Sequence, residues 1–126
     1  MDWKQKGFLS SLCLSNPNAV IVGSIGSISV DLKDIPHKNK ILVKGFMGGV
    51  LGIGLGYALG TSKEVIVVIG DGAFLMKMGG MATILKYAPK NLKVYVLNNG
   101  VYKSCGGQET MFSTIKDIIP FKVIDA

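Results

Sequence analysis

The chain has 126 residues, a length that fits one domain with a core large enough to fold without a disulfide or a structural metal. Hydrophobic residues make up 48% and charged residues 17%, which excludes an intrinsically disordered chain, and two cysteines without signal-peptide flanks predict a reduced, cytoplasmic protein. The net charge of +6 comes from lysines scattered along the chain with no arginine, so we expect a solvated lysine surface and no nucleic-acid partner.

The first half of the chain predicts helices that alternate with short apolar strands. A helix is expected over residues 2–14, because Phe8, Leu9 and Leu12 can share one face, with Asp2 as a possible N-cap. The elements expected after it are a strand at Ala19–Val22, a helix at Gly26–Leu32 and a strand at Ile41–Val43.

The second half contains the clearest strand, Glu64–Ile69, which is continuous and β-branched. The elements expected after it are a helix at Ala73–Tyr87, a strand at Leu92–Leu97, a short helix at Ser113–Ile118 and a last strand at Phe121–Ile124. Strands without polar alternation, separated by helices, are typical of a parallel sheet covered on both faces. We therefore predict an α/β fold: a single doubly wound domain over residues 1–126, with a mainly parallel sheet flanked by helices.

A glycine-rich run at residues 45–60 permits three interpretations. Glycine recurs at every fourth position from Gly48 to Gly60, which suits a helix packed closely against a sheet. The 18 uncharged residues from Gly45 to Ser62 also allow a membrane span, but so many glycines lower the hydrophobicity, and we expect no membrane association. Gly54 and Gly56 approach a dinucleotide fingerprint, yet no strong strand leads directly into them.

Three of the predicted strand ends carry small or polar residues, at 23–27, 70–72 and 98–100. Ligands of doubly wound sheets bind at the carboxyl ends of the strands, where these turns would meet. Asp71 stands between two glycines, and Asn99 follows one helix and one strand later. Asp and Asn oxygens with a neighbouring backbone carbonyl suit Mg²⁺, which prefers to share such ligands with a diphosphate. Each turn alone is ordinary turn chemistry, but together they predict a metal-diphosphate site.

The turn Gly70-Asp71-Gly72, the 25 residues that follow it and the pair Asn98-Asn99 resemble the thiamine diphosphate signature. The stretches 70–84 and 97–108 resemble the diphosphate-binding domain of phosphonopyruvate and sulfopyruvate decarboxylases. This resemblance runs from about residue 20 to residue 110. It implies thiamine diphosphate and Mg²⁺ as cofactors, and a small acidic 2-oxo acid as the substrate of a decarboxylase.

The resemblance also implies roles for individual residues. Asp71 and Asn99 would give side-chain oxygens to Mg²⁺, and Val101 its backbone carbonyl. Met47 would be the wedge that bends the cofactor, in a turn where Phe46 replaces the usual Ser. The residues that the resemblance places against the cofactor are Gly26, Ser27, Gly45, Met47, Gly70, Gly72, Ala73, Asn99 and Tyr102.

The resemblance leaves this chain incomplete as an enzyme. In the family, a Glu on a separate pyrimidine-binding domain activates the cofactor, and Glu64 and Glu109 are both unsuitably placed in this sequence. We therefore expect no catalytic residue on this chain, and a pyrimidine-binding partner subunit that supplies the Glu in a split, hetero-oligomeric decarboxylase. The domain is also shorter at its C-terminus than is usual. The alternative is a noncatalytic cofactor-binding or scaffolding remnant of the family.

Two further features have ordinary interpretations. Cys105 falls near the predicted cleft, but no His is placed to activate it, so we expect an incidental thiol. Met76, Met78 and Met81 are expected to fill the core. The segment 102–108 is open to two interpretations, a contact with the substrate or a flexible closing loop.

Overall fold

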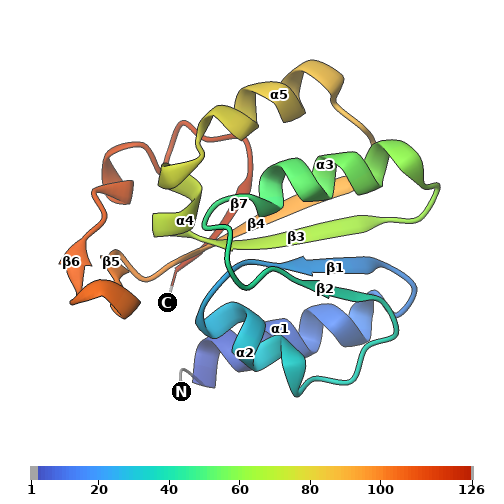
Figure 1. Cartoon of the computed structure of the whole chain (residues 1–126), viewed down its shortest axis with the longest axis horizontal. Coiled ribbons are helices and arrows are strands. Elements are labelled where there is room, and N and C mark those ends of the chain that lie inside the picture. The colour runs from blue at the N-terminus through green and yellow to red at the C-terminus, as the bar shows by residue number, and fades with distance from the viewer. Residues whose placement is uncertain (1–2, 126) are drawn as a thin grey trace.

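The computed structural model describes residues 3–125 and contains a five-stranded sheet in which every neighbouring pair of strands is parallel. The strands are β1 (Val20–Gly23), β2 (Lys40–Leu42), β3 (Val65–Gly70), β4 (Leu92–Asn98) and β7 (Lys122–Asp125). Their order across the sheet is β2-β1-β3-β4-β7, so the chain moves to one side from β1 and then returns to the other. Helices cover both faces (Figure 1), which confirms the predicted doubly wound α/β class.

The central strand β3 shows why the apolar runs of this sequence become covered strands. Val65, Val67 and Ile69 belong to the core on one face of the sheet, and Ile66 and Val68 to the core on the other. All five side chains are fully buried. Because successive side chains of a strand point to opposite faces, an unbroken apolar run is what a strand covered on both sides requires.

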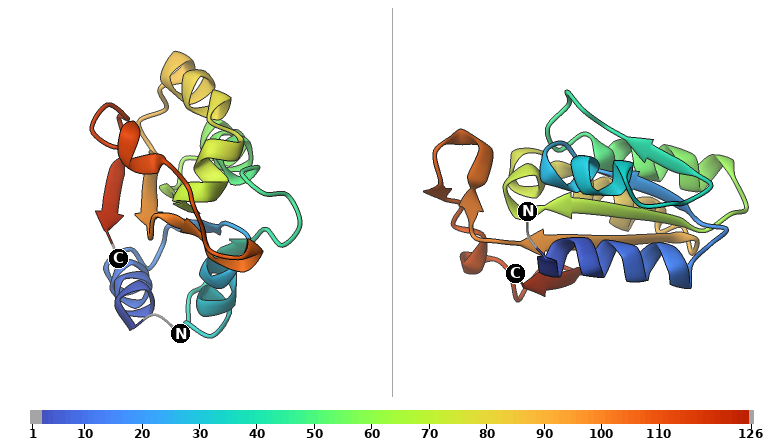
Figure 2. Two further views of the ribbon diagram at one scale, coloured as in Figure 1. Left: turned by 90° about the vertical axis from the view of Figure 1, so that its left-hand side faces the viewer. Right: turned by 90° about the horizontal axis from the view of Figure 1, so that it is seen from below.

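The helices form two layers, one on each face of the sheet (Figure 1 and Figure 2). One layer consists of α1 (Trp3–Ser15) and α2 (Ser27–Lys33), and the other of α3 (Val50–Gly60), α4 (Asp71–Met76) and α5 (Gly79–Tyr87). Leu9 and Leu12 of α1 are buried against the sheet, as their spacing predicts. Asp2, the predicted cap of that helix, lies outside the described residues.

The glycine-rich run forms α3, which lies directly on the sheet. A Cβ atom at Gly54 would stand 2.2 Å from Cγ2 of Val67, so only glycine allows the helix this close to β3. A Cβ atom at Gly52, Gly56 or Gly60 would meet no heavy atom within 4 Å. The closely packed helix is therefore the correct interpretation of the run. Among residues 3–125, no helix is both long enough and apolar enough to cross a membrane.

The single helix predicted over residues 73–87 is wrong in its start and in its continuity. The structure has two helices there, because α4 begins at Asp71 and α5 begins at Gly79. Glycine is a poor helix former, and the break falls next to Gly79-Gly80. A Cβ atom at Gly80 would also approach Cβ of Leu51 to 3.0 Å, so the second glycine lets α5 pack closely on α3.

Two other expectations for this half of the chain are corrected. Met76 and Met78 are 58% and 39% exposed, so they do not fill the core, although Met81 packs partly buried against it. The helix predicted at Ser113–Ile118 is a single turn of 3-10 helix, η2 (Phe112–Thr114), followed by turns. The backbone N–H groups of Thr114, Ile115 and Ile118 each bond to a carbonyl three residues back, so the segment closes in tight 3-10-type turns and not in an α-helix.

A small hairpin, which the sequence pattern did not predict, lies between β4 and β7. Its strands β5 (Val101–Tyr102) and β6 (Gln108–Glu109) pair antiparallel, and the 3-10 helix η1 (Lys103–Cys105) lies between them. Gly106 and Gly107 have φ angles of +109° and +80°, a conformation that glycine adopts without strain. The hairpin extends past the carboxyl ends of the strands at one end of the molecule (Figure 2).

Candidate functional site

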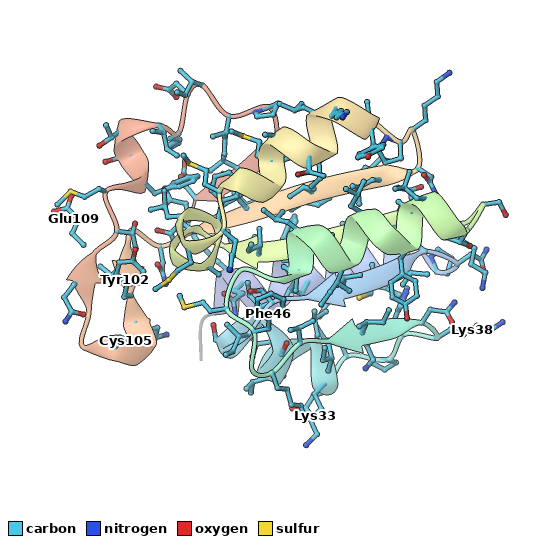
Figure 3. All side chains as sticks on the ribbon, turned by 45° about the horizontal axis from the view of Figure 1, so that its top comes forward. Lys33, Lys38, Phe46, Tyr102, Cys105 and Glu109 are labelled. Carbon is cyan, nitrogen blue, oxygen red and sulfur yellow. The ribbon has the colours of Figure 1, made fainter. Side chains whose placement is uncertain are left out.

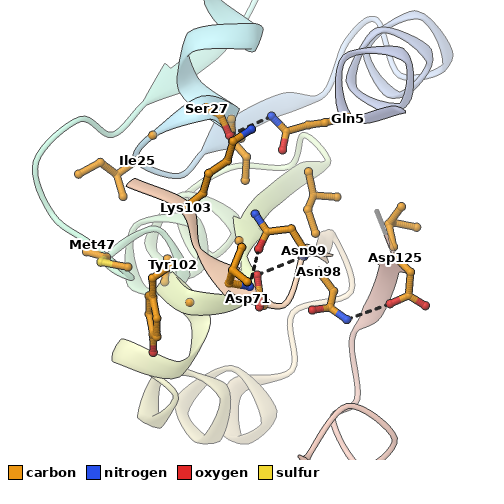
Figure 4. Close-up of a pocket in the computed structure, with 18 of the residues that line it drawn as sticks. Gln5, Ile25, Ser27, Met47, Asp71, Asn98, Asn99, Tyr102, Lys103 and Asp125 are labelled. Carbon is orange, nitrogen blue, oxygen red and sulfur yellow. Dashed lines mark hydrogen bonds between the residues drawn. The ribbon is translucent and has the colours of Figure 1, made fainter. Parts of the chain in front are cut away.

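A cavity of about 230 Å³ lies at the carboxyl ends of β1, β3 and β4 (Figure 4). It lies where the chain leaves β1 for α2 on one face and leaves β3 for α4 on the other, which is where doubly wound sheets bind ligands. Of the residues predicted to bind cofactor or metal, Gly45 does not line this cavity and is exposed in the turn before α3. The predicted residues that do line it are Gly26, Ser27, Met47, Gly70, Asp71, Gly72, Ala73, Asn99, Val101 and Tyr102.

Asp71 is the buried carboxylate of the cavity, with 2% of its surface exposed. Its Oδ2 accepts a hydrogen bond from Thr110 Oγ1 at 2.6 Å, and its Oδ1 accepts a long one from the Asn99 backbone N–H at 3.4 Å. Within residues 3–125 the ion pairs join Lys93 to Glu64 and Lys116 to Asp125, so no described lysine neutralises Asp71. A buried carboxylate without a paired cation is a natural position for a metal ion.

Asn99 stands beside Asp71 because a tight turn follows β4. Its Oδ1 accepts a hydrogen bond from Val101 N–H at 3.0 Å, and the Asn98 Oδ1 does the same for Gly100 N–H at 3.1 Å. Gly100 has a φ of +76°, which lets the chain turn sharply between Asn99 and Val101. Each amide oxygen retains a second lone pair, so Asn99 can still coordinate a cation while its side chain is held in place.

The oxygen donors of this corner suit a hard cation. Asp71, Asn99 and the backbone near Val101 offer carboxylate, amide and carbonyl oxygens from two neighbouring strand ends, as Mg²⁺ requires. Among the described residues, no group of three His, Cys, Asp or Glu side chains converges, so a metal here would depend on amide and backbone oxygens and on the ligand itself. The donor set therefore fits Mg²⁺ shared with an anionic ligand.

Gly72 and the Tyr102 ring form a closely packed wall of the cavity. A Cβ atom at Gly72 would lie 2.7 Å from the Tyr102 ring, so glycine is required for this approach. Figure 4 shows Tyr102 on the side of the cavity near Met47. Gly70, Gly72 and Ala73 all line the cavity, so the start of α4 forms part of its wall.

Met47 reaches the cavity because two glycines shape the turn that carries it. Gly48 has a φ of +83°, and a Cβ atom there would lie 2.6 Å from the Ala73 carbonyl oxygen. A Cβ atom at Gly49 would stand 2.1 Å from the Phe46 ring. The turn therefore packs Met47 partly buried against the core while it still lines the cavity, and Phe46 remains 53% exposed.

Residues of α1 complete one side of the cavity, and the sequence analysis did not identify them. Gln5 Nε2 donates to Ser27 Oγ at 3.1 Å and to Asp31 Oδ2 at 2.8 Å, and Lys4 lies next to it on the same rim. Asp31 is buried, so Gln5 joins the turn after β1 to a carboxylate inside the protein. No local pattern signals this contact, because 22 residues separate Gln5 from Ser27.

Asp125 closes the opposite rim from the last strand. It accepts hydrogen bonds from Asn98 Nδ2 at 3.0 Å and from Lys116 Nζ at 2.6 Å. The hydrogen bonds from Lys116 and, to a smaller degree, from Asn98 hold the pKa of Asp125 below its ordinary value. This contact braces the turn that carries Asn99 from the side of β7.

Neither glutamate of the chain lines the cavity. Glu64 lies just before β3, at the opposite end of the strand, and its carboxylate pairs with Lys93 at 2.9 Å. Glu109 is exposed on the hairpin near Cys105 and Tyr102 (Figure 3). Cys105 is a free, exposed thiol that does line the cavity. The site thus offers a corner of oxygen donors and a wall formed by the start of α4, but no glutamate.

The family model that describes the thiamine pyrophosphate enzyme, C-terminal TPP binding domain, matches residues 22–120. The chain is 40% identical to a phosphonopyruvate decarboxylase of Streptomyces hygroscopicus over 100 residues, which are 79% of this chain and 25% of that relative. It is 40% identical to the sulfopyruvate decarboxylase subunit beta of Methanococcus maripaludis, again over 79% of the chain and over 54% of the relative. The corresponding subunit of Methanocaldococcus jannaschii is 38% identical, over 72% of this chain and 49% of the relative.

A solved structure shares the fold. The 2-oxoglutarate:ferredoxin oxidoreductase from Magnetococcus marinus superposes with a TM-score of 0.65 over 84% of this chain and 36% of its own, at 18% sequence identity. The chain spans between a quarter and about half of the length of the curated relatives described above.

Proposed function

This chain belongs to the thiamine pyrophosphate enzymes, whose C-terminal TPP-binding domain it matches over residues 22–120, and from this membership we propose that it is the diphosphate-binding part of a decarboxylase. The proposed substrate is a small acidic 2-oxo acid of the sulfopyruvate or phosphonopyruvate type. The relatives that are 38–40% identical to this chain carry names that support this substrate class. Residues 1–126 act, in this proposal, as a single cofactor domain.

The observation that carries the proposal is the buried, unneutralised carboxylate of Asp71 beside the Asn99 turn. In this proposal Asp71 and Asn99 hold Mg²⁺ by side-chain oxygens and Val101 by its carbonyl. The backbone of Gly70, Gly72 and Ala73 at the start of α4 borders the diphosphate that shares the metal. The turn at Gly26 and Ser27 borders it from the end of β1, since both turns line the same cavity.

The chain's own residues bind and orient the cofactor. The chemistry that bound thiamine diphosphate supplies is that of an electron sink for decarboxylation. Met47, held by the turn at Gly48 and Gly49, is the apolar residue placed to support the cofactor between its two ends. The Gly45 backbone lies outside the cavity, so a contact from Gly45 to the cofactor requires this turn to shift.

A partner subunit completes the site in this proposal. The cavity volume of about 230 Å³ is below the roughly 300–1,000 Å³ of a typical small-molecule site, which fits part of a cofactor better than the whole. Both glutamates lie outside the cavity, so the Glu that activates the aminopyrimidine would come from a pyrimidine-binding subunit. The names of the beta-subunit relatives, which are parts of larger enzymes, support a hetero-oligomer.

The first prediction concerns Asp71. Calorimetric titration should detect Mg²⁺-dependent binding of thiamine diphosphate to the chain alone, to its mixture with a Glu-bearing subunit, or to both. Asp71→Ala removes a direct ligand, so we expect a loss of affinity beyond the roughly 10–100-fold that changes around a metal site produce. Asp117→Ala is the matched control, because Asp117 is exposed and does not line the cavity.

Either of two results would contradict the proposed function. If Asp71→Ala binds Mg²⁺ and cofactor like the unmodified chain, the metal assignment is wrong. If the unmodified chain binds under neither condition, the noncatalytic scaffold becomes the better description. Decarboxylation of a 2-oxo acid after mixing with the second subunit would eliminate the scaffold.

A further inference from the structure

Thr110 is a buried polar residue that contacts the metal corner and that no motif singles out. Only 3% of its surface is exposed. Its hydroxyl donates to Asp71 Oδ2 at 2.6 Å and accepts a hydrogen bond from the Phe112 backbone N–H at 3.3 Å. The hydroxyl hydrogen is thus directed at the carboxylate, and the acceptor side is occupied by the backbone. This arrangement holds the Asp71 side chain in one orientation.

The two ends of the segment 99–110 meet at the same carboxylate. Asn99 N–H reaches Asp71 Oδ1 at the start of the segment, and Thr110 Oγ1 reaches Asp71 Oδ2 at its end. The Thr110 N–H also donates to the Gly100 carbonyl at 2.9 Å, which closes the base of the loop. Asp71 therefore anchors the metal turn and the hairpin together.

The hairpin anchored in this way borders the cavity. Tyr102 and Lys103 both line it, and the Tyr102 ring packs where Gly72 has no side chain. Figure 4 shows Tyr102 and Lys103 on the ribbon that passes over Asp71. The orientation of Asp71 and the position of this wall are thus coupled through residues 99–110.

We propose that Thr110 is a positioning residue, which orients Asp71 for the metal and anchors the hairpin at the cavity. The inference rests on the proposed function, because it needs Asp71 to be a metal ligand. The short hydrogen bond occupies Oδ2, whereas the donor to Oδ1 is 3.4 Å away. Oδ1, which faces the Asn99 backbone and has only this long contact, would be the oxygen more open to a cation. A neutral hydroxyl donor leaves the carboxylate its full charge for this role.

The second prediction concerns the Thr110 hydroxyl, and two variants test it, Thr110→Val and Thr110→Ser. Valine keeps the shape and removes the donor, whereas serine keeps the donor. Titrating Mg²⁺ in the presence of thiamine diphosphate, under the condition in which the unmodified chain binds, should show an affinity about 10–100-fold lower for Thr110→Val. We expect Thr110→Ser to restore most of it. Thr114→Val is the matched control and should bind normally, because Thr114 is exposed on η2 and does not line the cavity.

A second readout follows the hairpin itself. Trypsin cleaves after Lys103, which is exposed on η1, so the cleavage rate reports how firmly the hairpin is held. Cleavage should be faster in Thr110→Val and unchanged in Thr110→Ser, without ligand present. If Thr110→Val does not fold, Thr110→Ala provides the same contrast with serine.

The outcomes separate this inference from the proposed function. Normal Mg²⁺ affinity in Thr110→Val, with binding lost in Asp71→Ala, overturns the role of Thr110 and leaves the proposed function standing. Unchanged binding in Asp71→Ala, or no binding by the unmodified chain, overturns both. A loss of affinity in Thr110→Val that serine restores supports the positioning role.

Discussion

Two aspartates are buried among residues 3–125, Asp31 and Asp71, and each is held by a donor from a distant part of the chain. Gln5 Nε2 reaches Asp31 across 26 residues, and Thr110 Oγ1 reaches Asp71 across 39. A buried polar group costs folding free energy unless it is hydrogen-bonded. At the scale of single residues, these donors determine which acidic side chains the protein can keep inside.

The third prediction concerns Gln5. Gln5→Leu keeps the approximate size of the side chain but removes the amide that donates to Asp31 and Ser27. We expect the free energy of unfolding to fall by about 1–3 kcal/mol, since a buried carboxylate loses a donor. Urea denaturation measures this change. Gln108→Leu is the control, because Gln108 is exposed on the hairpin, and equal losses in both variants would contradict the prediction.

Among the secondary-structure elements, α3 has two distinct faces although both contain glycine. Gly54 touches β3, whereas Gly52, Gly56 and Gly60 face open space. The four-residue spacing of Gly52, Gly56 and Gly60 places them on one face of the helix, and Gly54 lies away from that face. The same residue type therefore serves close packing at Gly54 and, at Gly52, Gly56 and Gly60, lines a groove beside β2.

The fourth prediction compares Gly54→Ala with Gly56→Ala. The methyl group at position 54 would collide with Val67, so we expect overpacking to lower the free energy of unfolding by about 1–3 kcal/mol. At position 56 the methyl group has room, and alanine favours helix, so stability should stay the same or rise by up to roughly 1 kcal/mol. Thermal unfolding of the two variants distinguishes these results. Equal effects would mean that α3 does not pack on β3 through Gly54.

For the whole molecule, the last strand connects the C-terminal segment to the candidate site. β7 pairs with β4, and the register places Asp125 opposite Asn98, next to the metal turn. Lys116 and Asn98 both donate to the Asp125 carboxylate. The final strand of the sheet therefore supports the turn on one rim of the cavity, and α1 forms the opposite rim.

The fifth prediction is a pH dependence of this connection. The folded-state pKa of Asp125 lies below its ordinary value of 3.8, chiefly because Lys116 donates to it. Its stabilising contribution is therefore fully present above pH 3.8 and is lost as the pH falls through the lower folded-state pKa. Asp125→Asn should be less stable than the unmodified chain at neutral pH, and the difference should shrink below that pH. Asp117→Asn serves as control, and a difference that does not vary with pH would contradict the assignment.

Much of the site could be predicted because its residues lie in local turn patterns. Gly70-Asp71-Gly72 and Asn98-Asn99 each follow an apolar run that forms a strand, and parallel strands bring their carboxyl ends together. Thr110 and Gln5 could not be identified in this way. Thr110 donates to Asp71, and Gln5 donates to Ser27 and Asp31, all far away in the chain. Neither residue occupies a periodic position that signals these contacts.

The sequence by itself determined the strand positions, the doubly wound class and the turns that meet at the cavity, since apolar periodicity and glycine-containing turns act over a few residues. Only the tertiary structure decided that the hairpin at residues 101–109 is anchored beside Asp71 and that Gly45 stays outside the cavity. It also decided which donors hold Asp71 and Asp31. These outcomes depend on contacts between segments distant in the sequence, and such contacts exist only once the helices have packed on the sheet.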